Sequence, residues 1–505
     1  MKVRLTLLML LLAALMVACA PADDGGSDGD ANTSDAGESD AGEDTEVVEI
    51  SYMYPGTVPD EVDLVEENLN EILVERINTR VDLQPLDWGQ FDERATLMLT
   101  TGEQCDIVFT ANWLNNYWQR VNQGSFIPLD DLLDEHAPET RSAMAEQFWD
   151  AVRVNGEIYG VPNRQIWTRS YGVVVDQTLA DQVGFDTGAV DELGDLEPYL
   201  EAVVDEVDIP PIYTDDLTLY YLAYAEFGGY DPQLLTPYVV VKADDPNRQA
   251  VNFAETPEFE ELVTLAYNWN QAGYMAPEPP PADVVFNDFL MGNYPFVVDV
   301  VTSFTDESYE SLYSMEEATA IQLVDPFVST NAATGTISSI CSTSEHPEQA
   351  MQFINLMNTD PEVFNIVAYG VEGVHWNWID EENLVIEQTE QGLNGYNPSA
   401  NWVFGNSFLG YMPNPALAGS NEDAQAQNDA AFASSVLGFA VDTEPINTEI
   451  AQVQAVIDEF GGPLTYGLVE PTEGIPELVE RMNEAGMQTI LEEVQRQIDE
   501  WAASR

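Results

Sequence analysis

The sequence predicts an α/β protein in which a mostly parallel sheet is covered by helices. Two observations indicate this class: short strand-like segments alternate with segments of helical periodicity, and apolar residues make up 45% of the 505-residue chain, which is enough for sizeable cores. The alternation is clearest near the start, in the order strand 46–54, helix 59–77, strand 81–84, helix 91–99 and strand 106–110. This order is typical of βαβ units. The roughly 460 residues from the first of these strands to the end of the chain predict two or three lobes.

The first 18 residues are expected to be a secretion signal. Lys2 and Arg4 give a positive start, and Leu5 to Val17 is apolar except for Thr6 and too short to span a bilayer comfortably. Ala18 directly precedes Cys19, an arrangement that resembles the lipobox of bacterial lipoproteins. The resemblance implies that Cys19 is acylated and anchors the chain through several acyl chains. The alternative is an ordinary signal peptide in which Cys19 has no such role.

Residues 19–46 are expected to form a disordered acidic tether that starts at the lipidated cysteine. From Ala20 to Glu46 the chain has no aromatic residue, no lysine and no arginine, so it cannot bury a core. A flexible chain of this length has a reach of roughly 30 Å, more where like charges repel. We therefore expect a globular body held clear of the lipid headgroups.

The charge of the chain excludes several classes of partner. It has 90 acidic and 15 basic residues, a formal net charge of -75, and its one lysine beyond the signal is Lys242. Binding to nucleic acid or to anionic lipid surfaces is not expected. We hypothesise that the acidity is an adaptation to concentrated salt, where counter-ions screen the repulsion. A thermal unfolding temperature that stays flat or falls as salt rises to molar levels would contradict that hypothesis.

The remaining cysteines flank two predicted buried strands. Cys105 precedes an apolar run and Cys341 follows one. They could form one disulfide in an oxidising exterior or remain two buried free thiols, and we favour the free thiols because the sequence does not show proximity. His136, His346 and His375 are not closely spaced with the cysteines, so we expect no metal and no cofactor.

The C-terminal segment predicts two helices that pack on the body. Apolar residues recur at helical spacing over 475–482 and over 487–501, and Gly486 separates the two stripes. No period of 20 to 50 residues repeats along the chain, which excludes solenoids and propellers.

Several segments resemble the extracellular solute-binding lipoproteins of bacterial ABC importers for carbohydrates. In the first half and middle of the chain these are Leu97–Glu103, Cys105–Trp113, Gly124–Leu132, Asn155–Pro162, Thr334–Ile340 and Glu345–Asn355. Further segments resemble the LipO-like branch, which has an uncharacterised C-terminal domain: Tyr369–Trp376, Trp402–Asn406, Asn483–Met487 and Gln495–Trp501. The order and spacing of these motifs cover nearly all of the expected mature chain.

The resemblance implies two α/β lobes that close on a solute by hinge motion and deliver it to an importer permease. Crossing segments are then expected near 165–171, 334–339 and 398–402. Lobe 1 would comprise 47–168 and 336–400, and lobe 2 would comprise 169–335 and 401–505 with the helices of 475–501. A monomeric receptor that is not an enzyme, with a sugar or oligosaccharide as its solute, is the implied function.

A sugar site needs flat aromatic surfaces beside carboxylate, amide and guanidinium groups. The candidates are residues of these types that follow strands, flank loops or lie at the expected crossings, namely Tyr54, Trp88, Asn112, Trp113, Trp167, Arg169, Tyr171, Asp299, Glu372, Trp376, Trp402 and Asn406. For each aromatic residue the alternative is packing in the core or between lobes. For Arg169 it is an ion pair with one of the many acids. Trp149, Trp269 and Trp501 are expected only to pack, and His375 is expected to be a satisfied core histidine.

Two other functions remain open. Paired carboxylates beside a sugar, at a separation of roughly 5 to 10 Å, would make a lipid-anchored glycoside hydrolase. The same fold could serve as the ligand-sensing subunit of a membrane receptor. The sequence contains no nucleophile elbow, P-loop, dinucleotide fingerprint or zinc motif, which disfavours other chemistries.

Overall fold

The computed structural model describes residues 46–169, 171–206, 210–212, 228–234, 238–279, 295–301, 306–398 and 400–503. The expected signal peptide, Cys19 with its expected lipidation, and nearly all of the expected tether lie outside these residues. Within them, no helix combines the length and the apolar character that a membrane span requires.

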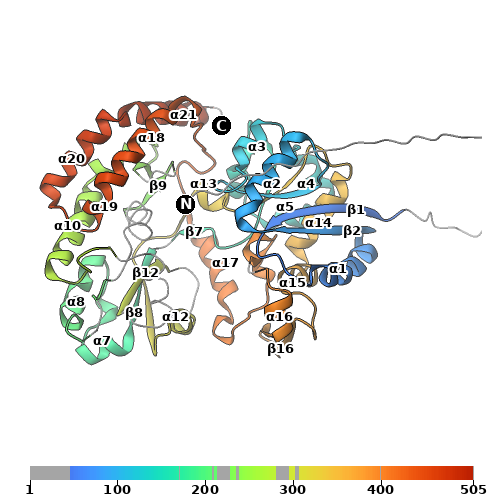
Figure 1. Ribbon diagram of the computed structural model, residues 1–505, viewed down its shortest axis with the longest axis horizontal. Coiled ribbons are helices and arrows are strands. Elements are labelled where there is room, and N and C mark those ends of the chain that lie inside the picture. Colours follow the sequence, from blue (N-terminus) through green and yellow to red (C-terminus); the bar gives the residue numbers. More distant parts are fainter. Residues whose placement is uncertain are drawn as a thin grey trace, which may run out of the picture. The chain divides into compact units, whose positions relative to one another are not determined.

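The first lobe is built on a five-stranded sheet with the order β2-β1-β3-β15-β6 (Figure 1). β1 (Val48–Pro55) is parallel to both β2 (Thr79–Leu86) and β3 (Ile107–Thr110). β15 (Ile337–Ile340) is antiparallel to β3 and to β6 (Val161–Pro162). The predicted strand and helix order at the start of the body is confirmed, with α1 (Val62–Ile77) after β1 and α2 (Trp88–Thr101) after β2.

Local sequence accounts for the ends of these helices. α1 ends at Asn78, which adopts a left-handed conformation with φ of 49° and donates its backbone N–H to the Val74 carbonyl. α2 begins after Asp87, whose side chain accepts a hydrogen bond from the backbone N–H of Gly89, and it ends at Gly102 with φ of 69°. The apolar stripe Val65, Leu69 and Leu73 on α1 is fully buried. In Figure 1, α2 lies on one side of β1 and β2, and α1 and α15 lie on the other.

Further helices and two small hairpins complete the first lobe. The helices are α3 (Tyr117–Asn122), α4 (Asp130–His136), α5 (Pro138–Ala143), α6 (Glu146–Ala151), α13 (Thr330–Ala333), α14 (Pro347–Thr359), α15 (Pro361–Tyr369), α16 (Glu390–Gly395) and α17 (Ser420–Ala430). The hairpins pair β4 (Arg153–Val154) with β5 (Glu157–Ile158), and β16 (Trp376–Asp380) with β17 (Val385–Gln388).

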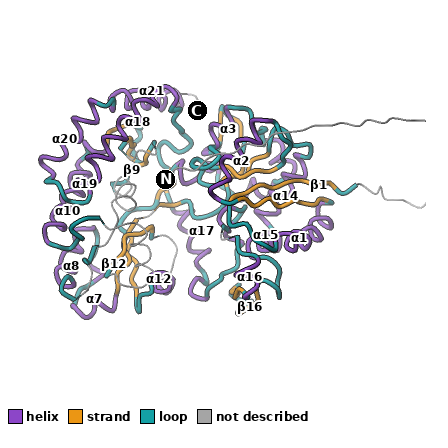
Figure 2. The backbone as a smooth tube through the Cα atoms, in the orientation of Figure 1, coloured by secondary structure: helices purple, strands orange, loops and turns teal. Residues whose placement is uncertain are grey.

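The described sheets of the second lobe are antiparallel, unlike the mostly parallel sheet expected throughout. β8 (Tyr171–Asp176) lies between β12 (Phe296–Val300) and β13 (Ala318–Gln322). β10 (Val239–Lys242) lies between β9 (Tyr230–Pro232) and β11 (Ala250–Asn252). The surrounding helices, drawn in purple in Figure 2, include α7 (Gln177–Val183), α8 (Glu197–Val203), α10 (Pro257–Ala272), α12 (Asp306–Tyr313), α18 (Asn447–Val456) and α19 (Gly462–Thr465).

The two predicted C-terminal helices are present as α20 (Pro471–Glu484) and α21 (Met487–Ala503). Gly486 separates them with φ of 111°, a conformation that glycine adopts without strain. Their apolar stripes face a core shared with β10 and α10, and the fully buried members are Leu478, Met482, Met487, Ile490, Val494 and Ile498.

A small three-stranded sheet joins the crossing segments between the lobes. It contains β7 (Thr168–Arg169), β14 (Phe327–Val328) and β18 (Phe432–Ala433), with β14 in the middle. The core of the first lobe takes in side chains from Ala400 to Leu437, where the sequence analysis assigned 401 onwards to lobe 2. Phe404 packs its ring edge on Tyr54 at 4.9 Å, which holds this stretch on the first lobe. We therefore propose a lobe boundary near residue 437.

Cys105 and Cys341 form a disulfide, so the preference for two free thiols is wrong. The antiparallel register of β15 against β3 places Ile340 opposite Ile107, and the Cys341 N–H donates to the Asp106 carbonyl at 2.9 Å. The two cysteines therefore lie next to each other just beyond the paired strands, although 236 positions separate them. The pairing depends on the neighbours of β15, which the sequence alone does not reveal.

Candidate functional site

Three tryptophans from separate segments gather at the edge of the first sheet where its parallel strands end. Trp88 and Trp402 stack with ring centroids 5.5 Å apart and planes inclined by 14°. Trp113 lies 6.1 Å from Trp88 and 6.2 Å from Trp402. We call Trp88, Trp113 and Trp402 the tryptophan platform. Trp88 follows β2, Trp113 follows β3, and Trp402 belongs to the 3₁₀ helix Asn401–Val403.

The platform is partly open to solvent. Trp113 is 46% exposed, and Trp88 and Trp402 are half-buried. Large aromatic side chains are usually buried, and an exposed group of them at the carboxyl ends of parallel strands is typical of a ligand site. Flat indole faces can contact the apolar C–H face of a sugar ring. The structure thus brings together three of the residues that the sequence analysis selected.

The surrounding backbone holds the platform in place. Trp113 donates its indole N–H to the Gly335 carbonyl at 2.8 Å, just before β15. The backbone N–H of Gly56 donates to the Leu86 carbonyl at 2.9 Å, which joins the ends of β1 and β2. The next residue, Thr57, donates to the Pro398 carbonyl at 3.2 Å and so brings in the loop before Trp402. The platform is therefore attached to rigid strand ends rather than to a free loop.

Asn112, also selected from the sequence, connects this edge to the crossing helix α13. Its amide Nδ2 donates to the backbone carbonyl of Asn331 at 3.1 Å and to the Asn331 side-chain oxygen at 3.0 Å. Asn331 in turn donates to the Pro232 carbonyl in β9 of the second lobe at 3.2 Å. The Oδ1 atom of Asn112 is buried and accepts no hydrogen bond from the described residues, so it is a free acceptor beside the platform.

Two further residues near the platform were missed by the sequence analysis. Gln165 donates its side-chain amide to the Thr336 hydroxyl at 2.7 Å, directly after Gly335. Arg164 is half-buried, and its backbone N–H donates to the Gly405 carbonyl at 2.7 Å. Burial lowers the pKa of the Arg164 guanidinium. The scarcity of basic residues in the chain was the signal that could have identified Arg164.

Four other selected residues are buried and engaged in packing. Tyr54 is fully buried, and desolvation raises the pKa of its phenol well above the ordinary value. Trp167 packs on Phe148 with ring centroids 4.0 Å apart. Trp376 donates its indole N–H to the Gly370 carbonyl at 3.0 Å, and Asn406 donates its side-chain amide to the Asn358 carbonyl at 3.2 Å. None of these four offers an open face near the platform in this structure.

The last four selected residues do not join the platform in the described structure. Glu372 is exposed and forms a backbone bridge with Trp376. Arg169 lies in β7 opposite Phe327, and Tyr171 and Asp299 lie in the paired strands β8 and β12. The side chains of these three lie outside the described atoms.

The residues expected only to pack do so. Trp149 is fully buried, Trp269 is 2% exposed, and Trp501 contacts Phe439 with ring centroids 5.7 Å apart. His375 is fully buried, with Nδ1 accepting from the Val371 N–H at 2.8 Å and Nε2 lying 3.0 Å from a Glu61 carboxylate oxygen. Both ring nitrogens are therefore occupied, which agrees with a satisfied core histidine.

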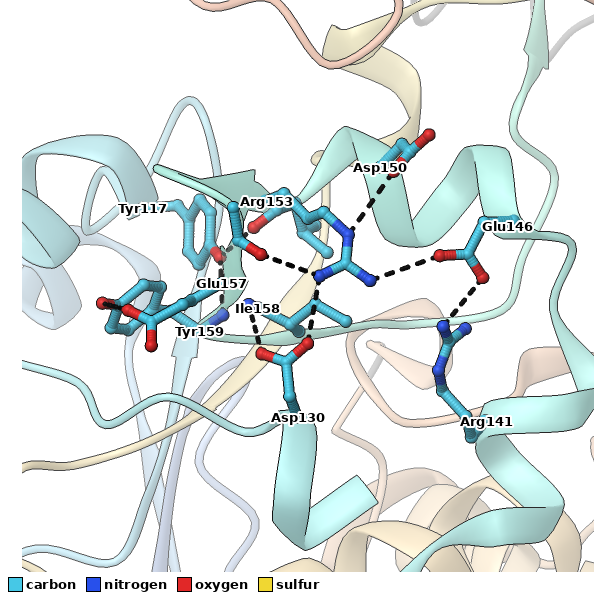
Figure 3. Close-up of polar contacts among 11 residues, drawn as sticks. Tyr117, Asp130, Arg141, Glu146, Asp150, Arg153, Glu157, Ile158 and Tyr159 are labelled. Carbon is cyan, nitrogen blue, oxygen red and sulfur yellow. Dashed lines mark hydrogen bonds and ion pairs between the residues drawn. The ribbon is translucent and has the colours of Figure 1, made fainter. Parts of the chain in front are cut away.

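A second polar cluster surrounds Arg153 in the β4–β5 hairpin (Figure 3). Its guanidinium forms ion pairs with Asp130 at 3.0 Å, Glu146 at 3.2 Å and Asp150 at 3.4 Å. Glu146 also pairs with Arg141 at 2.7 Å, so each basic group in Figure 3 has an acidic partner. We interpret this network as a tie between α4, α5, α6 and the hairpin. Among the described residues, no group of three or more histidine, cysteine, aspartate or glutamate side chains could hold a metal ion.

Known proteins show similarity to nearly the whole body of the chain. A carbohydrate ABC transporter substrate-binding protein from Streptococcus pneumoniae serotype 4 is 26% identical over 458 residues, which cover 89% of this chain and 90% of that protein. The chain is similar to the substrate-binding proteins of carbohydrate importers. Residues 435–503, which include α20 and α21, match the family model described as a domain of unknown function, DUF3502. Both matches confirm the resemblance inferred from the sequence motifs.

Solved structures confirm the two-lobed solute-binding fold. The N-glycan transport solute binding protein NgtS from Streptococcus pneumoniae superposes with a TM-score of 0.77 at 22% identity, covering 90% of this chain and 98% of that one. NgtS in complex with Man1GlcNAc gives a TM-score of 0.67 at 24% identity, covering 90% and 99%. An extracellular solute-binding protein from Bifidobacterium longum subsp. infantis gives 0.65 at 13% identity, covering 90% and 98%.

Proposed function

We propose that this chain is an extracellular substrate-binding protein that captures an oligosaccharide on the tryptophan platform and delivers it to the permease of an ABC importer. The observation that carries the proposal is the platform itself: three indoles from three segments meet at the carboxyl ends of the parallel strands of the first sheet, with Trp113 46% exposed. The similarity to a carbohydrate ABC transporter substrate-binding protein over 89% of the chain supports the same function.

Binding is favoured over hydrolysis by the similarity to a carbohydrate ABC transporter substrate-binding protein, and amide, carbonyl and hydroxyl groups suited to binding lie around the platform. In the part of the chain that the structure describes, amides, carbonyls and a hydroxyl from Asn112, Gly335, Gln165 and Thr336 lie next to the three indoles. The carboxylates of Asp87 and Asp92 are also nearby, and they accept the backbone N–H groups of Gly89 and Asn115. Amide, carbonyl and hydroxyl groups can hold sugar hydroxyls, whereas glycoside hydrolysis requires a pair of carboxyl groups on either side of the scissile bond.

We further propose that residues 1–18 direct secretion, that Cys19 is lipidated, and that the chain acts as a monomer outside the membrane on its acidic tether. The motif Ala18-Cys19 and the composition of residues 20–46 support this placement. A Cys19→Ser variant should be released from the membrane fraction into the medium. Retention of that variant in the membrane would contradict lipid anchoring.

Titration calorimetry with a panel of oligosaccharides tests the capture function. We expect saturable binding that weakens about tenfold or more in Trp88→Ala and in Trp402→Ala, because each loses a stacking surface. Trp378→Ala is the matched control, since this half-buried tryptophan packs on Trp376 and Tyr411 away from the platform. Unchanged binding in a Trp88→Ala, Trp402→Ala double variant would refute the platform. Release of shorter sugars during the titration would instead identify a hydrolase.

A further inference from the structure

Arg164 is anchored in the first crossing segment, between β6 and β7. Its backbone N–H donates to the Gly405 carbonyl at 2.7 Å, and its own carbonyl accepts from the Ser407 backbone N–H at 2.8 Å and the Ser407 hydroxyl at 3.0 Å. These bonds hold the main chain of Arg164 in place. None of them involves the guanidinium.

The guanidinium of Arg164 differs from every other buried or half-buried arginine that the structure describes. Arg120 donates to Asn115 at 2.8 Å, Arg248 donates to the Ser435 carbonyl at 2.7 Å, and Arg94, Arg141 and Arg153 pair with carboxylates. The Arg164 side chain donates no hydrogen bond to the described residues and forms no ion pair with them, in a chain with 90 acidic residues. Asp429 on α17 acts on it only through its charge.

A half-buried guanidinium without a partner is unfavourable. It presents five N–H donors, and removing them from water without replacement acceptors carries a substantial free-energy penalty. Arg80 provides the contrast, because it is exposed and water can satisfy it. Among the described residues the Arg164 guanidinium has no acceptor, so water at its exposed part is left to satisfy it, and a ligand oxygen could replace that water.

Arg164 belongs to the segments that frame the tryptophan platform. Gly405, its backbone partner, lies three residues after Trp402. The adjacent Gln165 side chain bonds Thr336, next to the Gly335 carbonyl that holds the Trp113 indole. On the facing helix α17, Asn428 donates to the Gln165 carbonyl at 2.7 Å. Its neighbour Gln427 has a buried Oε1 atom that accepts no hydrogen bond from the described residues.

We propose that Arg164 binds a carboxylate of the captured solute, so that the solute is an acidic oligosaccharide with at least one uronic or sialic acid type residue. The inference rests on the proposed function and names its substrate class. The planar guanidinium can donate two parallel hydrogen bonds to a carboxylate and neutralise its charge. A neutral sugar hydroxyl has no charge to neutralise and cannot accept both bonds in this geometry. The net charge of -75 opposes the approach of an anionic solute, so the pair with Arg164 has to outweigh that repulsion. Salt reduces the repulsion, because exposed charges are screened beyond about 8 Å at physiological ionic strength.

The test compares one acidic oligosaccharide with its neutral counterpart, in which each carboxyl group has been reduced to a hydroxymethyl group. Titration calorimetry with the full-length protein should show about tenfold or tighter binding of the acidic form. Arg164→Gln should weaken the acidic form by about 10- to 100-fold, the range expected for hydrogen bonds to a charged group, and change the neutral form less than threefold. Arg164→Lys should retain part of the preference, and the control Arg80→Gln should retain all of it.

Each outcome bears on a different claim. Equal affinity of the wild-type protein for the acidic and neutral forms would overturn the acidic substrate class. This comparison needs no variant, so it stands even if Arg164→Gln does not fold. Equal weakening of both forms in Arg164→Gln would make Arg164 a positioning residue and also overturn the inference. Tight binding of neutral glycans alone would refute the inference and leave the proposed function intact. Absence of binding to any carbohydrate would refute the proposed function itself.

Discussion

The disulfide between Cys105 and Cys341 should make a large contribution to the stability of the first lobe. It connects the residue before β3 to the residue after β15, and both sulfur atoms are buried. We predict that a Cys105→Ser, Cys341→Ser double variant still folds, because the β3–β15 pairing and the surrounding core remain. Its free energy of unfolding should nevertheless fall by several kcal/mol.

The magnitude follows from the length of the closed loop. With 236 positions between the cysteines, the chain-entropy relation gives a loss of about 5.5 kcal/mol at 25 °C. Measured effects of native disulfides range from about 2 to 5 kcal/mol, so the structure predicts a loss near the top of that range. For a urea dependence of about 3 kcal/mol per molar, the unfolding midpoint should fall by roughly 2 M.

Tryptophan fluorescence during urea unfolding measures the shift in the unfolding midpoint of the first lobe. Of the ten tryptophans, Trp269 and Trp501 pack in the second lobe, and the rest lie in the first, so the signal reports mainly on the lobe that holds the disulfide. A reducing agent should lower the midpoint of the wild type to that of the double variant and leave the double variant unchanged. Coincident midpoints for oxidised wild type, reduced wild type and double variant would refute the reasoning.

Two further predictions concern the loop around His375 and the close approach at Gly405. Hydrogen bonds from Gln391 and His375 hold the pKa of Glu61 below its ordinary value of 4.5. The stabilisation of the fold by ionised Glu61 is therefore complete above pH 4.5, and it is lost as the pH falls through the lowered pKa. The difference in thermal midpoint between wild type and Glu61→Gln should therefore shrink below pH 4.5, and a constant difference from pH 7 to pH 3 would contradict the pairing. A Cβ atom at Gly405 would lie 2.2 Å from the Met357 carbonyl oxygen, so Gly405→Ala should lower the free energy of urea unfolding by about 1 to 3 kcal/mol. Gly462→Ala, which meets no atom within 4 Å, should not lower it, and equal effects of the two substitutions would show that the close contact is absent.

The sequence allowed two members of the tryptophan platform to be selected because they follow strands that periodicity reveals, and the third, Trp402, because it flanks a loop at Gly405. Trp88 and Trp113 come directly after two parallel strands, and such residues meet at one edge of a sheet whatever the connections between them. Tyr54 also ends a strand, yet it is fully buried because Phe404 and Tyr52 pack against its ring. Whether a strand end is open or covered depends on segments several hundred residues away, which periodicity does not place.

The same limit explains the residues that were missed. The scarcity of basic residues singles out Arg164, but its place beside the platform depends on the backbone contacts with Gly405 and Ser407. Asn331 can be recognised only once Asn112 and Pro232 are known to lie on either side of it. The disulfide likewise depends on β15 lying beside β3. Each case involves a contact between residues far apart in the chain, where local propensity and spacing contain no information.

The position of β15 also determines when the first lobe can be completed during synthesis. This strand lies between β3 and β6 in the middle of the sheet, yet it is residues 337–340 of the chain. When a ribosome has produced β1, β2, β3 and β6, the edges of β3 and β6 that β15 will join are still unpaired. They remain so while well over 150 further residues are made, at a rate of about 5 to 20 residues per second. The order of strands in this sheet therefore means that the first lobe cannot be completed until β15 has been made, long after the other four strands.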